Sequence, residues 1–188
     1  MSETSRKMID LIEVGPRDGL QNEPLNLSLD ERFRMVSHLI ESGLRRIEVG
    51  AFVSPKWVPQ MADTKKLAQR LIQAQLADEL PQDVWFSALV PNQRGLQDAL
   101  SVGLKEIAIF AASSESFSEK NINCSIEESF SRFDPVMKQA QKEGVRVRAY
   151  LSTAFGCPYE GRVPVEKVVR LTERLLDLGA FELSLGDT

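Results

Sequence analysis

The ten residues ESGLRRIEVG at 41–50 contain the end of an amphipathic helix, a glycine, a charged step and a run that favours a β-strand. The same order recurs in SVGLKEIAIF at 101–110, KEGVRVRAYL at 142–151 and DLGAFELSLG at 177–186. The glycine in each copy suits the left-handed residue that closes a helix. Because strands that alternate with helices build βαβ units, the repeat predicts an α/β fold with a parallel sheet.

Along the whole chain, the sequence predicts six strands and five helices. The strands are expected at Ile9–Val14, Arg46–Val49, Val84–Val90, Glu106–Ala111, Val145–Leu151 and Phe181–Leu185. The helices are expected near 29–42, 63–77, 94–102, 126–142 and 164–178. Ser28 with Glu31, and Ser125 with Glu128, fit the S-x-x-E capping box at two helix starts. No linker or low-complexity stretch divides the chain, so residues 1–188 are expected to form one domain.

Two architectures accommodate this order of elements. A complete (β/α)₈ barrel needs eight strands and about 250 residues. An open, doubly wound sheet is complete with six strands, but the residues after the first strand, GPRDGLQNE, lack its usual G-x-G-x-x-G fingerprint. Periodicity alone leaves this choice open.

Composition restricts the class of protein and its partners. The 188 residues are 43% hydrophobic and 27% charged, with a formal net charge of −4, which is ordinary for a globular domain. Basic residues are scattered among acidic ones, which argues against a nucleic-acid partner. No apolar run approaches the roughly 18 residues of a membrane span. With two cysteines and no signal-peptide pattern at the start, the expected location is the cytoplasm.

Polar residues gather where the predicted strands end, which is the edge that carries active sites in both architectures. They are Arg17, Asp18, Gln21, Glu48, Asn92, Tyr150, Ser152, Thr153, Asp187 and Thr188. A carboxylate beside an arginine on a glycine turn, as in Arg17–Asp18–Gly19, suits a divalent cation and an anionic or carbonyl substrate. The sequence therefore predicts a catalytic rim at this edge.

Four longer motifs carry a family resemblance: VGPRDGLQNE at 14–23, FVSPKWVPQMAD at 52–63, EKNINCSIEES at 119–129 and GCPYEGRV at 156–163. Together with the closing LSLGDT at 183–188, they resemble the 3-hydroxy-3-methylglutaryl-CoA (HMG-CoA) lyases along nearly the whole chain. The R-D-G element alone is similar to a wider superfamily of metal-dependent barrels that includes isopropylmalate and homocitrate synthases.

The resemblance implies a TIM-barrel lyase that cleaves HMG-CoA to acetyl-CoA and acetoacetate with Mg²⁺ or Mn²⁺, in leucine degradation or ketone-body metabolism. By the same resemblance, Arg17 stabilises the enolate oxygen and Asp18 binds the metal. Gln21, Glu48, Tyr150 and Asp187 line or support the pocket, Asp187 as a metal-shell or substrate-orienting group. The resemblance also implies a homo-oligomer, expected to be a dimer.

Some features of the family are missing from these residues: a His-x-His pair and an asparagine that complete the metal site, and a glycine-rich loop with a catalytic cysteine. His38 is expected at the surface of a helix, and Cys124 and Cys157 are expected to be structural. The chain is therefore predicted to match about the N-terminal two-thirds of the family, six of eight barrel strands, and to be inactive by itself. A related synthase or aldolase acting on a 2-oxo acid is the alternative activity.

Two further expectations concern the surface. The segment Ser113–Ser125 is predicted to be a polar loop that binds the CoA thioester, through Lys120, Asn121, Asn123 and the N–H groups of the helix that follows. A barrel that stops after six strands has two unpaired edges and leaves apolar inner side chains exposed. The 188-residue chain is therefore predicted to self-associate or to bind hydrophobic dyes.

Overall fold

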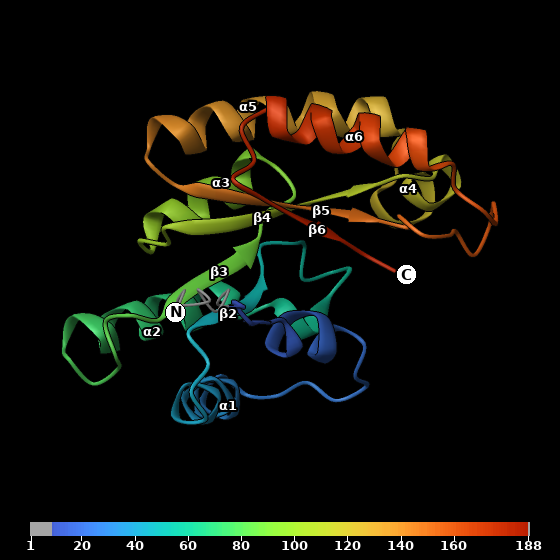
Figure 1. Ribbon diagram of the computed structural model, residues 1–188. Helices are drawn as coiled ribbons and strands as arrows, with labels where there is room; N and C mark the ends of the chain where they lie inside the picture. Colours follow the sequence, from blue (N-terminus) through green and yellow to red (C-terminus); the bar gives the residue numbers. More distant parts are fainter. Residues whose placement is uncertain (1–8, 188) are drawn as a thin grey trace, which may run out of the picture.

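A computed structural model describes residues 9–187 and shows one sheet of six parallel strands in chain order (Figure 1). The strands are β1 (Ile12–Glu13), β2 (Arg46–Ala51), β3 (Trp85–Leu89), β4 (Glu106–Ala112), β5 (Arg146–Ser152) and β6 (Glu182–Leu185). An open doubly wound sheet reverses its strand order at a switch point, whereas this order runs uninterrupted from β1 to β6. The structure therefore confirms the barrel-type arrangement and rules out the open sheet.

Six α-helices follow the strands, where five were expected. They are α1 (Leu29–Glu41), α2 (Thr64–Leu76), α3 (Gln93–Ser101), α4 (Glu115–Ile122), α5 (Ile126–Lys142) and α6 (Val165–Asp177). Two short turns, the π-helix η1 (Gly15–Gly19) and the 3₁₀-helix η2 (Pro59–Met61), follow β1 and β2. In Figure 1, α5 and α6 cover the outer side of the β4–β6 part of the sheet, and α1 and α2 lie beside the β1–β3 part. None of these helices within residues 9–187 has the length and apolar character needed to span a bilayer.

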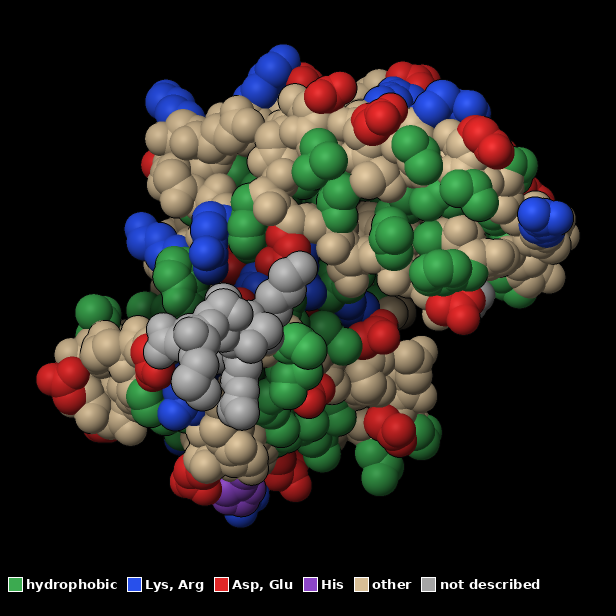
Figure 2. All heavy atoms as spheres, in the orientation of Figure 1, with side chains coloured by type: hydrophobic (Ala, Val, Ile, Leu, Met, Phe, Trp, Pro, Cys, Tyr) green, Lys and Arg blue, Asp and Glu red, His purple; other side chains and the backbone are tan. Residues whose placement is uncertain are grey.

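The capping boxes and closing glycines predicted from the sequence are present at the helix ends. Ser28 and Ser125 each accept a hydrogen bond from the backbone N–H three residues on, and the glutamate there bonds back, so both capping boxes form. The glycines of the repeated unit adopt positive φ, as at Gly43 with φ of 98°. On the face shown in Figure 2, acidic and basic side chains lie interspersed over the helices.

Two predicted segments differ from the structure. The first strand has two residues instead of the six of Ile9–Val14, because its pairing with β2 begins only at Ile12, opposite Arg46, the first residue of β2. Ile9 and Leu11 are accordingly exposed. The predicted loop Ser113–Ser125 contains α4, which Ser114 caps by accepting from Phe117 N.

The sheet curls, and its two faces differ in chemistry. Side chains that alternate along the strands, such as Ile47, Ile107 and Val147, are buried in the apolar core formed with the helices. The residues between them include charged groups that bond across the curl: Arg46 Nη2 of β2 lies 2.7 Å from Glu182 Oε2 of β6, although three strands separate them. The inner face, where apolar side chains were predicted, therefore also carries charged ones.

Candidate active site

The RDG element lies at the carboxyl end of β1, within the π-helix η1. Pro16 is in its first turn, where a missing N–H costs no internal bond, and the N–H groups of Arg17 and Asp18 both bond to Val14 O, at 3.0 and 2.7 Å. The predicted glycine turn is therefore a wider helical turn, of a kind frequent at functional sites. It buries the Arg17 side chain and leaves the Asp18 side chain 57% exposed, with Asp18 Oδ1 2.6 Å from Arg17 Nη1.

Glu48 of β2 is the centre of the rim. Its carboxylate is fully buried, and its Oε1 accepts from Arg17 Nε at 2.5 Å. Its Oε2 accepts from Arg148 Nη2 at 2.9 Å and from the Tyr150 hydroxyl at 3.0 Å, both on β5. These bonds cross the inner face of the curled sheet, because β3 and β4 separate β2 from β5. One buried carboxylate thus joins η1, β2 and β5.

Electrostatics fix the protonation states in this cluster. Burial lowers the pKa of the Arg17 guanidinium, but the charge and hydrogen bond of Glu48, together with Tyr150 and Asp18, outweigh burial and raise the pKa, so Arg17 remains a cation. Burial, and after it the Glu48 carboxylate, raises the pKa of Tyr150 well above its ordinary value of about 10. The neutral Tyr150 hydroxyl can therefore donate to Glu48 while it accepts from Arg148 Nη2 at 2.8 Å.

Arg148 was missed by the sequence reasoning. It stands two residues before Tyr150 on β5, so the strand alternation puts both side chains on one face. That signal was available in the run Arg146-Val147-Arg148-Ala149-Tyr150 once Tyr150 had been placed at the rim. Arg148 is 3% exposed and its guanidinium lies 4.8 Å from the Tyr150 ring centroid, which adds a cation–π contact to the cluster.

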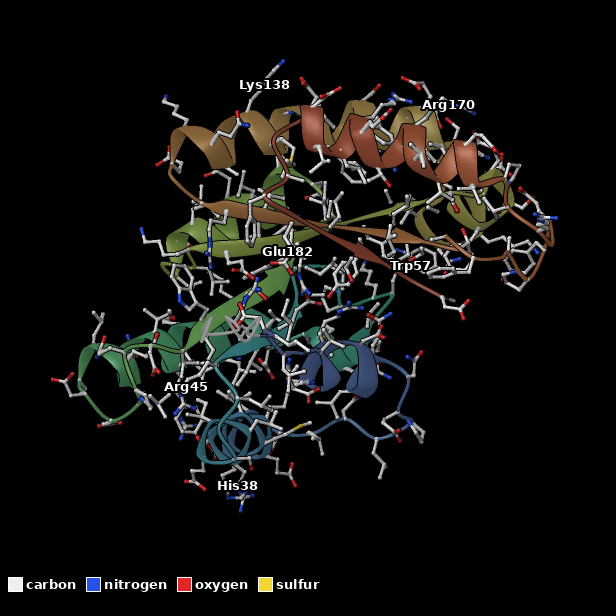
Figure 3. The ribbon with its side chains drawn as sticks, in the orientation of Figure 1. His38, Arg45, Trp57, Lys138, Arg170 and Glu182 are labelled. Carbon is white, nitrogen blue, oxygen red and sulfur yellow. The ribbon has the colours of Figure 1, made fainter. Side chains whose placement is uncertain are left out.

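A second polar cluster lies nearer the amino ends of the strands. Glu106 of β4 accepts from Arg46 Nη2 at 3.1 Å and from Arg146 Nη2 at 2.7 Å, and Arg46 also bonds Glu182. Figure 3 shows Glu182 near the middle of the molecule, on the side of β6 that faces the β2–β3 part of the sheet. Active sites of barrel enzymes lie at the opposite, carboxyl ends, so this cluster is separate from the catalytic edge and links β2, β4, β5 and β6 across the curl.

The other candidates are placed as follows. Gln21 is half-buried directly after η1, and Asp187 is exposed beyond β6; Thr188 lies outside the described residues. Asn92 caps α3 by accepting from Gly95 N at 3.0 Å, so its oxygen already has a structural partner. His38 lies on the outer side of α1, directed away from the sheet, as predicted (Figure 3).

Lys120 and Asn121 lie on α4, and Asn123 is its left-handed C-cap residue. Their contacts are with α4 itself and with the loop 154–163: Asn121 Nδ2 donates to Phe117 O, and Lys120 Nζ lies over the Tyr159 ring. At the start of α5, Ile126 N bonds to Glu115 and Glu128 N bonds to Ser125. Two of the N–H groups at this helix start, where an anion was expected, are thus occupied by the chain's own side chains.

The described residues supply little to a metal site. Within residues 9–187, no group of three His, Cys, Asp or Glu side chains could hold a metal ion. Mg²⁺ prefers an octahedron of oxygen ligands, of which protein carboxylates supply one or two. Asp18 is one exposed carboxylate at the right edge, but it does not form a complete site for Mg²⁺ or Mn²⁺.

A curled parallel sheet whose strand ends converge on a buried arginine–carboxylate–tyrosine cluster defines a barrel-type enzyme domain with its site at the carboxyl edge. The chain belongs to the HMGL-like family, which matches residues 8–188.

Curated relatives and a solved structure agree with this family. The hydroxymethylglutaryl-CoA lyase of Pseudomonas mevalonii is 48% identical over 182 residues, and the cytoplasmic 3-hydroxy-3-methylglutaryl-CoA lyase of Rattus norvegicus is 47% identical over 180. Each alignment covers 96% of this chain, but 58% and 50% of those two proteins. The crystal structure of the Pseudomonas aeruginosa hydroxymethylglutaryl-CoA lyase superposes with a TM-score of 0.88 at 47% identity, over 97% of this chain and 58% of that one. This chain thus spans about half to three-fifths of their length.

Proposed function

We propose that the native protein is a carbon–carbon lyase that cleaves HMG-CoA to acetyl-CoA and acetoacetate. The observation that carries the proposal is the buried Arg17–Glu48–Arg148–Tyr150 cluster at the catalytic edge of an HMGL-like domain. In this retro-Claisen step a base takes the C3 hydroxyl proton, and the oxygen's electron pair forms the ketone of acetoacetate. The C2–C3 bond breaks, its electrons form the acetyl-CoA enolate, and C2 then takes up a proton.

Arg17 is proposed to stabilise the enolate oxygen. Its Nε is bonded to Glu48 and its Nη1 to Asp18, so the guanidinium is fixed before substrate arrives. A fixed positive charge in a buried site needs no reorganisation when negative charge develops, which is why such groups dominate enolate and oxyanion chemistry. Glu48 and Tyr150 are proposed to act through Arg17 and Arg148, by fixing their orientation and balancing their charge.

The remaining roles rest on position. We propose that Gln21 binds substrate beside η1, that Asp187 orients it from the end of β6, and that Asp18 is a ligand of Mg²⁺ or Mn²⁺. The bound metal would supply Lewis-acid activation of the substrate oxygens. Lys120, Asn121 and Asn123 on and after α4 are proposed to bind the CoA part of the thioester.

The names of the relatives bear on the cellular location. Matched lyases include one named cytoplasmic and others named mitochondrial. We propose a cytoplasmic location and a homodimer for the native protein, with operation in leucine degradation or ketone-body metabolism.

The test uses the complete native gene product, assayed with Mg²⁺ on HMG-CoA and on a panel of 2-oxo acids that a related synthase or aldolase would use. Equal amounts of acetyl-CoA and acetoacetate from HMG-CoA are expected. Cleavage of a 2-oxo acid without any reaction of the thioester would replace the lyase assignment with the aldolase one. The 188-residue polypeptide assayed alongside is expected to be inactive, because no group of three His, Cys, Asp or Glu side chains within residues 9–187 could hold the metal ion.

A further inference from the structure

The loop 154–163, between β5 and α6, is folded against α4 by four separate contacts. Ser114 Oγ lies 2.9 Å from Cys157 Sγ, and Ser116 N donates to Glu160 Oε1 at 2.6 Å. The Tyr159 ring centroid lies 6.2 Å from that of Phe117 and 3.9 Å from Lys120 Nζ. The first two turns of α4 are thus joined to the tip of a loop about 40 residues later in the chain.

The tip of this loop is rigid. Cys157 and Gly161 exchange two backbone hydrogen bonds, at 2.7 and 2.8 Å, and Gly161 takes a φ of 72° that suits glycine. Tyr159 N donates to Cys157 Sγ at 3.4 Å. The backbone bond from Ser116 N lowers the pKa of Glu160, so its carboxylate is ionised at neutral pH and keeps this contact. Tyr159 is therefore presented on a closed turn.

The same ring continues an aromatic row that starts in the sheet. Phe110 of β4 lies 6.4 Å from Phe117, which in turn contacts Tyr159. Lys120 sits at the outer end of this row, one turn beyond Phe117 on α4. A lysine ammonium on a flexible four-carbon stem would otherwise occupy many rotamers, and a cation–π contact restricts them.

We propose that Tyr159 is a positioning residue that holds the Lys120 ammonium ready for the phosphates of the CoA thioester. The ring contacts one side of the ammonium, so N–H donors on its other side remain available to an anion. The proposal rests on the proposed function, since it assumes that Lys120 meets CoA. It gives Tyr159, at the tip of the loop 154–163, a part in substrate binding.

The experiment is a double-mutant cycle in the complete native gene product. The variants are Tyr159→Leu, Lys120→Met and the double variant, with Tyr159→Phe retaining the ring. Phe155→Leu is the matched control, an exposed aromatic on the same loop. The readouts are the Kd for coenzyme A by calorimetry, and KM and kcat for HMG-CoA. A thermal melt of each variant checks that it is folded.

Tyr159→Leu is expected to weaken coenzyme A binding and to raise KM by about two- to five-fold with kcat unchanged. Tyr159→Phe and Phe155→Leu should match the native protein, and Tyr159→Leu should have no effect once Lys120 is methionine. Additive effects, an equal loss in Tyr159→Phe, or a changed melt with unchanged Kd would overturn the proposal. If the native protein binds coenzyme A but does not cleave HMG-CoA, the proposed function fails and the cycle is judged on Kd alone.

Discussion

At the scale of single residues, the catalytic edge depends on Glu48. Its carboxylate accepts from the Arg17 and Arg148 guanidinium groups and from the Tyr150 hydroxyl, and its side chain is fully buried. A buried charge pair contributes little by itself, but removing one partner leaves the others without a counter-charge in a medium of low dielectric. Glu48 therefore matters chiefly as the counter-charge of the two buried arginines.

Glu48→Gln in the native protein should destabilise the fold by about 3–5 kcal/mol, because two buried arginines lose their carboxylate. The unfolding free energy from urea titration measures this. Asp83→Asn is the control, since Asp83 forms an exposed ion pair with Arg45 and its loss should cost about 0–1 kcal/mol. If Glu48→Gln lowers the unfolding free energy no more than Asp83→Asn does, the cluster is not electrostatically coupled.

Tyr150 gives a prediction at alkaline pH. Its folded-state pKa is raised, first by burial and then by Glu48, so it stabilises the fold fully below about pH 10, the ordinary tyrosine value. That contribution is lost as pH rises above this value toward the folded-state pKa, because the unfolded chain gives up the proton first. Since these 188 residues contain two tyrosines, the Tyr159→Phe variant of the 188-residue polypeptide reports on Tyr150 alone.

In Tyr159→Phe, ultraviolet absorbance should show tyrosinate forming only as the protein unfolds, at a pH above 10. The melting temperature of the Tyr150→Phe variant should depend less steeply on pH in the same range. Ionisation of Tyr150 near pH 10 in a protein that is still folded would contradict the burial of its hydroxyl.

At the scale of elements, β2 positions Glu48 through a close approach at Gly50. The register of β2 with β3 shifts between Glu48 and Gly50. A Cβ at Gly50 would clash with Thr64 Oγ1 and lie 2.9 Å from Arg32 Nη2. Neither neighbour is free to move, because Thr64 Oγ1 bonds Met61 O at 2.9 Å and Arg32 Nη2 bonds Val49 O at 2.8 Å.

Gly50→Ala should therefore destabilise the native protein by about 1–3 kcal/mol through overpacking. Gly19→Ala is the matched control, because a Cβ there meets nothing within 4 Å. Urea unfolding of the two variants makes the comparison. Equal stabilities would mean that the end of β2 is loose enough to absorb a methyl group.

The sequence predicted most elements because their signals are local: a capping box, a closing glycine or a run of β-branched residues. It missed α4 because that helix buries only Phe117 and Ser118 and has no apolar stripe. It overextended β1 because strand length depends on the partner strand. In the site, Arg17, Glu48 and Tyr150 could be named from a motif and strand ends, whereas Arg148 could be found only by applying the strand alternation back from Tyr150.

At the scale of the whole molecule, the sheet of residues 9–187 has β1 and β6 as its two edges. Phe181 and Leu185 beside or within β6 are 42% and 48% exposed, and Val165 and Val169 on α6 are also exposed. Exposed apolar groups beside an unpaired strand favour pairing with another chain.

The purified 188-residue polypeptide should therefore self-associate and bind ANS. Sedimentation velocity and dye fluorescence measure the two properties. Leu185→Lys, which places a charge on the edge strand, should reduce both. A strictly monomeric polypeptide with a cooperative melt and no dye signal would contradict this prediction and show that these surfaces do not pair with another chain.

The most direct test of the account is the steady-state rate of HMG-CoA cleavage by the native full-length protein and its Arg17→Met variant. If the buried Arg17 stabilises the enolate, kcat should fall by about 10²–10³-fold, as when a preorganised oxyanion donor is removed, while KM changes little. Equal yields of acetyl-CoA and acetoacetate from the native protein complete the expected result. A variant with kcat within about three-fold of the native value would contradict the account, because the cluster around Glu48 would then not act on the reaction.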